Sequence, residues 1–256
     1  TSAPTMPGTL DIPACIEAVR TDGFCILRDH LPRSAVEAVR DAFAPLLDAY
    51  VREHDDNPNR GARRHYIPLP FRPPFYHPAF FNNDAIIAIT SGILGEELAI
   101  DQFASDTPLK GSVHQDVHAD IGPLFSDQPD LLTPPALIAT NFSFIDVTPA
   151  HGPFEVASGT HRMPRAQALA DIEHGRIPLK PLCLNVGDVL IRDVRTLHRG
   201  TPNTTDQPRG VAVISYVRHW FRREGHQSEN QMPAATWAML SEREQRLLRL
   251  IPRDSR

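Results

Sequence analysis

The sequence predicts a mainly β protein in which helices come first and short antiparallel strands then close into a barrel or jelly roll. Six short apolar segments follow residue 98, separated by Gly, Pro, Asn and Asp rather than by long helices. Proline accounts for 25 of the 256 residues, and helix interiors tolerate proline poorly, so an all-helical bundle is excluded. The chain is 41% apolar and 22% charged, as in ordinary globular proteins with one large core.

The N-terminal part is expected to be helical after a flexible start at residues 1–10. Apolar residues at helical spacing predict a helix over Ile12–Arg20. Asp22-Gly23 then breaks the pattern, and Phe24–Leu27 is typical of a short buried strand.

A second helix is predicted from Ser34, which has Glu37 three residues later in the spacing of a capping box. Its apolar stripe is Val36, Val39, Phe43 and Leu47. Pro45 lies inside this stripe, and we expect it to kink or divide the helix.

Residues 60–81 combine five prolines with aromatic residues and the run Arg63-Arg64-His65-Tyr66. So many prolines predict a segment without regular structure. Long loops of this kind often cover a site, so we expect a lid in which His65 and Tyr66 contact the substrate. A loop that only wraps the core is the alternative.

The remaining chain is expected to form the β core over residues 98–220 and a C-terminal segment over residues 221–256. A capping box at Ser241 and Glu244 predicts a helix through Leu250. The whole chain is expected to be a single domain, 1–256, with its helical part at 11–100. The predicted strands are Leu98–Phe103, Ser112–Val117, Leu137–Val147, Leu182–Val186, Val189–Arg192 and Val211–Val217.

Net charge, cysteine spacing and the absence of long apolar runs indicate which partners and which compartment to expect. The net charge of −5 gives no electrostatic reason to expect nucleic acid or an anionic membrane as partner. The three cysteines are far apart and lack metal-site spacing, which predicts free thiols in a reducing compartment. Without a signal sequence or an apolar run of about 20 residues, we expect a soluble, cytoplasmic protein. The sequence does not indicate its oligomeric state.

Four polar residues alternate along one segment: His114, Asp116, His118 and Asp120. In a strand, alternate residues share one face, so all four would point the same way. A polar outer face is one interpretation of this pattern. The functional interpretation is a metal site, because an imidazole and a carboxylate two residues apart can reach one ion.

His198 is the candidate third ligand, and it follows the turn at Gly187-Asp188 and a predicted strand. Two histidines and one carboxylate leave three neighbouring positions of an octahedral ion open, as in the facial triad of non-haem Fe(II) oxygenases. Tetrahedral zinc would need a fourth protein ligand, and none is well placed. Arg209 could hold a carboxylate group with its forked guanidinium.

These motifs resemble the phytanoyl-CoA dioxygenase family of Fe(II)/2-oxoglutarate oxygenases over most of the chain. His114-Gln115-Asp116 is similar to the family's HxD motif, and Arg209 follows His198 by eleven residues, the family's interval for its oxoglutarate-binding arginine. His118-x-Asp120 is a second HxD motif, and spacing alone cannot choose between the two motifs. The resemblance favours His114 and Asp116. Further similar stretches are Asp22-Gly23-Phe24, Gly152–Val156, Ser158–Arg162 and Gly187–Asn203.

The resemblance implies a double-stranded β-helix, cupin-like core that holds Fe(II) through His114, Asp116 and His198. It implies 2-oxoglutarate bound to Arg209, with further cosubstrate contacts expected from Thr140 and Phe103. Dioxygen would be the other co-reactant, and succinate and CO2 the by-products. A carboxylate ligand favours hydroxylation or another oxidation, such as desaturation, over halogenation.

The substrate is expected to be a small organic molecule, as in family members that modify natural products. Besides the two residues of the proline-rich segment, we expect His118, Trp220 and Phe221 to contact it. Two other classes remain open: a cupin-type metal enzyme that does not use oxoglutarate, and a non-catalytic binding module.

Overall fold

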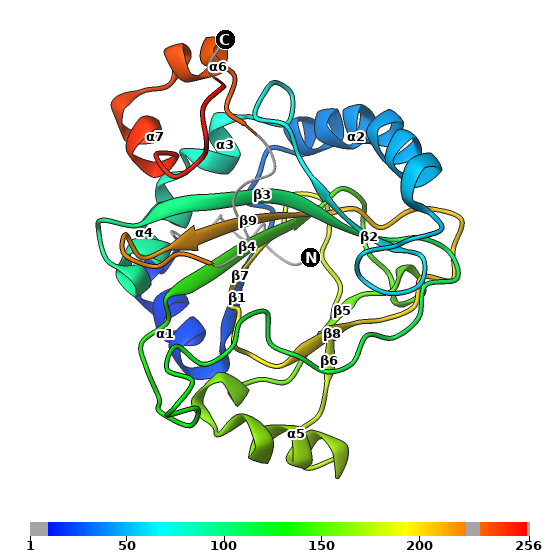
Figure 1. The fold of residues 1–256 in the computed structure, drawn as a ribbon, viewed down its shortest axis with the longest axis vertical. Helices are drawn as coiled ribbons and strands as arrows, with labels where there is room; N and C mark the ends of the chain where they lie inside the picture. The colour runs from blue at the N-terminus through cyan, green and yellow to red at the C-terminus, as the bar shows by residue number, and fades with distance from the viewer. Residues whose placement is uncertain (1–9, 224–230, 255–256) are drawn as a thin grey trace, which may run out of the picture.

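The computed structural model describes residues 10–223 and 231–254, and its centre is a six-stranded sheet in the order β1-β7-β4-β9-β3-β2 (Figure 1). A second, three-stranded sheet has the order β6-β5-β8. Every strand pair is antiparallel. Residues of both sheets line one cavity, so this is the expected jelly-roll core with flanking helices. The strands are β1 (Phe24–Leu27), β2 (Arg64–Pro68), β3 (Ala99–Pro108), β4 (Leu137–Ser143), β5 (Phe154–Val156), β6 (Lys180–Leu182), β7 (Val189–Asp193), β8 (His198–Gly200) and β9 (Val211–Val217).

Helices α1, α2, α4 and α7 contact the large sheet, on the face that points away from the cavity, whereas α5 lies beside the small sheet (Figure 1). Side chains on this face pack with helix residues into the main core, for example Phe103, Ile138 and Ile214 with Ile89 of α4. Alternate strand residues point to the other face and line the cavity. The helices are α1 (Ile12–Asp22), α2 (Arg33–His54), α3 (Pro78–Phe81), α4 (Asp84–Leu94), α5 (Arg165–Glu173), α6 (Ala234–Met239) and α7 (Glu242–Leu247), with 3₁₀ turns η1 (Pro149–His151) and η2 (Thr160–Arg162).

The first two predicted helices are present, although the start of the second was wrong. Helix α2 begins at Arg33 after Pro32, which makes no side-chain capping bond, so Ser34 is not its cap. Its predicted apolar stripe is buried, and the helix continues through Pro45 without being divided. A proline inside a helix removes one backbone hydrogen bond, and the buried stripe stabilises the helix against that loss.

The expectation that residues 60–81 form an irregular lid was wrong. Strand β2 lies inside this segment and pairs with β3 at the edge of the large sheet, where Pro68 as the last residue is tolerated. The aromatic side chains that follow, including Phe71 and Phe81, are buried in the main core. The segment therefore forms one wall of the protein rather than a movable cover.

Four predicted strands also differ from the structure. The strand expected at Leu98–Phe103 continues to Pro108 in β3, and the strand expected at Leu137–Val147 ends at Ser143 in β4. Ser112–Val117 is extended chain without strand pairing, and the strand expected at Leu182–Val186 lies earlier, at β6. The capping box of Ser241 and Glu244 is confirmed at the start of α7. All three cysteines are free. No helix within the described residues has the length and apolar character that crossing a membrane requires.

Candidate metal centre and cosubstrate pocket

Three potential metal ligands converge at one side of the cavity: His118, Asp120 and His198. One ligand atom from each lies within 4.8 Å of the other two, and within the described ranges this is the one group of three or more His, Cys, Asp or Glu that could hold an ion. The Oδ1 atom of Asp120 is 3.3 Å from Nε2 of His198 and 3.8 Å from Nε2 of His118. Two imidazoles and one carboxylate are the donor set of the facial triad.

Backbone pairing places the two histidines side by side. The backbone N–H of each of His118 and His198 donates to the carbonyl of the other at 2.9 Å. The Nδ1 atom of His118 is 2.7 Å from the carbonyl oxygen of Asp116, and that of His198 is 2.8 Å from the carbonyl oxygen of Thr196. An Nδ1–H that donates to a carbonyl leaves the Nε2 lone pair free for a metal. The residues therefore fit a divalent ion.

The structure corrects the choice between the two HxD motifs. The side chains of His114 and Asp116 do not line the cavity, whereas those of His118 and Asp120 do. Asp116 contributes only its backbone carbonyl, to His118. The period-two argument failed because residues 111–120 do not form a regular strand: the segment meets β8 only at separate points, one of them the bridge of His118.

Arg192 of β7 holds the carboxylate of the triad. Its Nη1 is 2.7 Å from Oδ2 of Asp120, and its Nε donates to Oδ1 of Asn141 at 3.1 Å. Burial alone would raise the pKa of Asp120, but the charge of Arg192 and the neighbouring His198 hold the pKa of this carboxyl well below its usual range. Burial and the proximity of His198 lower the pKa of His118. Both groups are therefore kept in the protonation states that bind a metal.

The cavity beside the triad has a volume of about 350 Å³, a size common for small-molecule sites. Apolar and polar residues share its walls, and the apolar ones include Leu137, Ala139 and Val213 from the large sheet. The polar groups converge from β2, β3, β4 and β9. They include Tyr66, Gln102, Asp106, Asn141, Arg209 and Ser215.

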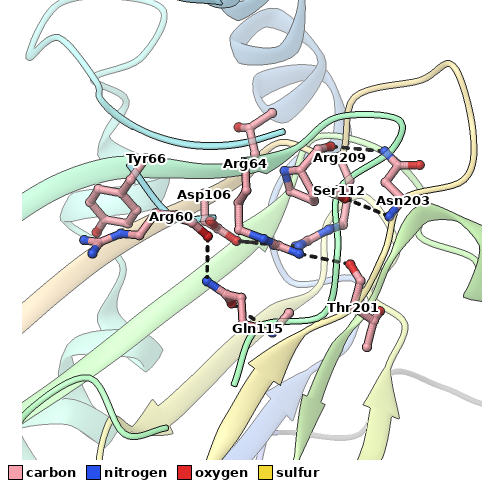
Figure 2. Close-up of polar contacts among 12 residues, drawn as sticks. Arg60, Arg64, Tyr66, Asp106, Ser112, Gln115, Thr201, Asn203 and Arg209 are labelled. Atoms are coloured by element: carbon pink, nitrogen blue, oxygen red, sulfur yellow. Dashed lines mark hydrogen bonds and ion pairs between the residues drawn. The ribbon is translucent and has the colours of Figure 1, made fainter. Parts of the chain in front are cut away.

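Arg209 lies immediately before β9 and is 3% exposed. Its Nη2 is 3.6 Å from Oδ2 of Asp106, and Nη1 of Arg64 is 3.2 Å from the same oxygen (Figure 2). The Nε of Arg209 is buried and has no hydrogen-bond partner among the described residues. Burial lowers the pKa of Arg209 to about 10, so it remains charged at neutral pH. Two guanidiniums thus share one carboxylate, and a donor of Arg209 is available to a second anion.

The cosubstrate contacts expected from Thr140 and Phe103 were wrong. Thr140 is paired with Ile191 and Ile214, whose side chains belong to the main core on the opposite face of the sheet. Phe103 packs against Phe71 and Phe81, with ring centroids 5.7 and 4.9 Å away. The neighbours in sequence, Asn141 and Gln102, point into the cavity instead. A shift of one residue exchanges the faces of a strand.

The five expected substrate contacts have different positions. Tyr66 and His118 line the cavity, the latter within the candidate metal site. His65 is fully buried on the other side of β2, near Asp55, and Trp220 is 56% exposed outside the cavity. Phe221 packs against an apolar cluster that includes the cavity residues Leu137 and Val213.

Sequence reasoning missed Arg192 and Arg64, two buried arginines that belong to this site. Arg192 directly follows the apolar run Val189–Ile191 in the same strand, where a charged residue that must be buried is itself a signal. Arg64 belongs to the segment interpreted as an exposed lid, so its burial could not be inferred.

Comparisons with known proteins identify the family of the chain and proteins that share its fold. The family model for phytanoyl-CoA dioxygenase (PhyH) matches residues 77–211, more than half of the chain. The crystal structure of AviO1 from Streptomyces viridochromogenes Tue57 has a TM-score of 0.64 and 20% identity, and the match covers 84% of this chain and 99% of that one.

Two further solved structures have similar scores. SnoK, described as a non-heme alpha ketoglutarate dependent carbocyclase from nogalamycin biosynthesis, has a TM-score of 0.63 and 19% identity, with coverage of 85% of this chain and 87% of that one. HygX from Streptomyces hygroscopicus, solved with nickel, 2-oxoglutarate and hygromycin B bound, has a TM-score of 0.61 and 18% identity, with coverage of 81% and 88%. At these sequence identities the structural similarity shows a shared fold and nothing more.

Proposed function

Because this chain belongs to the phytanoyl-CoA dioxygenase family, we propose that it is an Fe(II)- and 2-oxoglutarate-dependent oxygenase that hydroxylates a small organic molecule. We assign His118, Asp120 and His198 as the iron ligands and Arg209 as the cosubstrate arginine. The observation that carries the proposal is the convergence of two imidazole Nε2 atoms and one carboxylate oxygen in the cavity that Arg209 also lines.

Bound iron supplies the redox chemistry that couples decarboxylation of 2-oxoglutarate, to succinate and CO2, with oxidation of the substrate. Arg209 provides the charge that binds the remote carboxylate of the cosubstrate, because its Nε has no other acceptor among the described residues. Arg192 fixes Asp120 through Oδ2 and leaves Oδ1 directed at the two histidines. Apolar residues of the cavity wall, among them Leu137, Ala139 and Val213, limit the water around the reacting centre.

We further propose that the substrate is a natural product or one of its precursors. Support comes from similar structures whose descriptions name nogalamycin biosynthesis and hygromycin B. Those neighbours include a carbocyclase and an epimerase, so the mass of the product distinguishes the reactions. Hydroxylation adds one oxygen atom, epimerisation leaves the mass unchanged, and oxidative ring closure removes two hydrogens.

The test is anaerobic addition of Fe(II) and 2-oxoglutarate to the purified protein, followed by visible spectroscopy. The metal–oxoglutarate chelate gives a weak charge-transfer band, and admission of oxygen should then release succinate. Asp120→Ala should abolish the band, whereas the matched variant Asp116→Ala should keep it. A band that survives Asp120→Ala and disappears in Asp116→Ala would move the ligands to the other HxD motif. Absence of the band from the unmodified protein would refute the oxoglutarate-dependent function.

A further inference from the structure

Arg60 is an exposed cation at the cavity wall. Its guanidinium carbon lies 4.6 Å from the centre of the Tyr66 ring, and it lines the same cavity as the metal site. Within residues 10–223 and 231–254, no carboxylate forms an ion pair with it. A cation over an aromatic face is weakly stabilised and can still accept an anion on its other side.

The backbone around Arg60 is fixed by its neighbours. Asn59 pairs with Tyr66 as a strand would: its side-chain oxygen accepts from the Tyr66 N–H at 2.7 Å, and its amide donates to the Tyr66 carbonyl at 3.0 Å. The carbonyl of Arg60 accepts from Gln115 at 3.3 Å, and Gln115 accepts from the N–H of Gly200, two residues after His198 (Figure 2). The backbone of Arg60 is therefore linked by hydrogen bonds through Gln115 to β8, the strand that carries His198.

The Tyr66 ring beneath Arg60 is fixed as well. Its hydroxyl donates to Oε1 of Gln102 at 3.0 Å, and the same oxygen accepts from Arg223 at 3.0 Å. Tyr66 also packs against the apolar cluster that includes Leu137 and Val213. Arg60 and Tyr66 thus join a charged edge to an apolar wall, and this surface suits a molecule with both characters.

The other arginines of the cavity have charged partners. Arg192 pairs with Asp120, and Arg223 forms two bonds of 2.9 and 3.0 Å with Asp101. Arg209, together with the adjacent Arg64, shares Asp106. Iron(II) and the 2-oxoglutarate dianion balance each other, so the described residues of the loaded cavity would still carry excess positive charge. Among the arginines of the cavity, Arg60 is the one without an acid beside it in the described part of the chain.

We infer, resting on the proposed function, that the substrate is an organic acid whose carboxylate binds Arg60 while its apolar part lies along Tyr66, Leu137 and Val213. Arg60 is exposed, so water solvates it when no anion is bound. A carboxylate would match its guanidinium fork, which a neutral group would not. The contact would fix which carbon faces the metal, because the loop of Arg60 and the strand of His198 are joined through Gln115.

The test compares octanoate with its neutral isostere octanamide, by calorimetric titration of the anaerobic protein with Fe(II) and saturating 2-oxoglutarate. We expect octanoate to bind at least about 10-fold more tightly than octanamide, and Arg60→Gln to weaken octanoate binding by about 10- to 100-fold without changing octanamide binding. Arg60→Lys should keep the preference for the acid. The matched control Arg52→Gln removes an exposed arginine that does not line the cavity and should behave as the unmodified protein does.

Equal binding of acid and amide, binding of neither, or a preference that survives Arg60→Gln would overturn the inference. So would loss of the charge-transfer band on adding octanoate, since the acid would then be displacing 2-oxoglutarate. Octyl phosphate serves as a third ligand: a preference for it over octanoate would replace the carboxylate by a phosphate and overturn the assignment to an organic acid. A missing band before any titration would refute the proposed function itself, which separates the two failures.

Discussion

Replacing Gly200 by alanine should disturb the wall behind the metal site, because the added Cβ would lie 2.5 Å from Cζ and Nη1 of Arg64. Arg64 is 1% exposed and cannot swing into solvent without leaving its partners. Its Nη2 donates to the carbonyl of Thr201 at 2.9 Å, and its Nη1 donates to Asp106 at 3.2 Å. The alanine would therefore force the guanidinium out of one or both contacts.

The loss of stability caused by Gly200→Ala can be worked out from those two hydrogen bonds of Arg64. A hydrogen bond to a charged group contributes about 1.5–3 kcal/mol to stability. The bond to Thr201 is buried, so its full value applies, whereas Asp106 is 26% exposed and its share is reduced by solvent screening. We expect Gly200→Ala to lower the free energy of unfolding by about 3 kcal/mol. Because Arg64 and Arg209 share Asp106, 2-oxoglutarate should also bind more weakly.

Urea unfolding and 2-oxoglutarate titration check both effects. Gly122→Ala is the matched control, because no atom lies within 4 Å of a Cβ built there; it should change stability by less than about 0.5 kcal/mol. In an Arg64→Ala background, Gly200→Ala should cost almost nothing. The reasoning would be refuted if Gly200→Ala left both the free energy of unfolding and the 2-oxoglutarate affinity unchanged. It would also be refuted if the substitution lowered the free energy of unfolding equally with and without Arg64.

Three further predictions concern the charged groups. Arg209→Ala should weaken 2-oxoglutarate binding by two to three orders of magnitude, as expected for about 2–5 kcal/mol, while Fe(II) binding by calorimetry stays near normal; unchanged oxoglutarate affinity would contradict the assignment. Arg192→Ala should weaken Fe(II) binding about 10- to 100-fold, because a partner that orients a ligand is lost, and retained affinity would show that Asp120 needs no such support. Burial lowers the pKa of His65 and of His161, so below about pH 6.5 the unfolded chain binds protons that the folded chain does not. The metal-free protein should therefore lose stability as the pH falls from 7.5 to 5.5, and equal urea midpoints at the two pH values would argue against this.

From the sequence, the histidine and aspartate that bind the metal could be assigned to one of two HxD motifs, but the sequence could not decide which. Both motifs have the same spacing, and the resemblance favoured His114 and Asp116. The choice depends on which residue of the segment pairs with β8, and the backbone bridge between His118 and His198 decides it. Such a long-range pairing is absent from local sequence patterns.

The sheet itself was largely predictable, and the faces of its strands were not. Val211–Val217 was expected with the bounds of β9, because a continuous apolar run between turn residues is a strong local signal. In a strand buried on both faces, however, nothing in the run tells which residues face the cavity. Thr140 was therefore chosen where its neighbour Asn141 lines the site.

Locating the metal is the most direct test of the assignment of His118, Asp120 and His198. Crystals of the protein grown anaerobically with Fe(II) and 2-oxoglutarate would give an anomalous difference peak at the iron absorption edge. We predict a single strong peak about 2 Å from Nε2 of His118, Nε2 of His198 and Oδ1 of Asp120, with the cosubstrate carboxylate at Arg209. A peak between His114 and Asp116, or one that involves fewer than two of the three proposed ligands, would contradict the assignment.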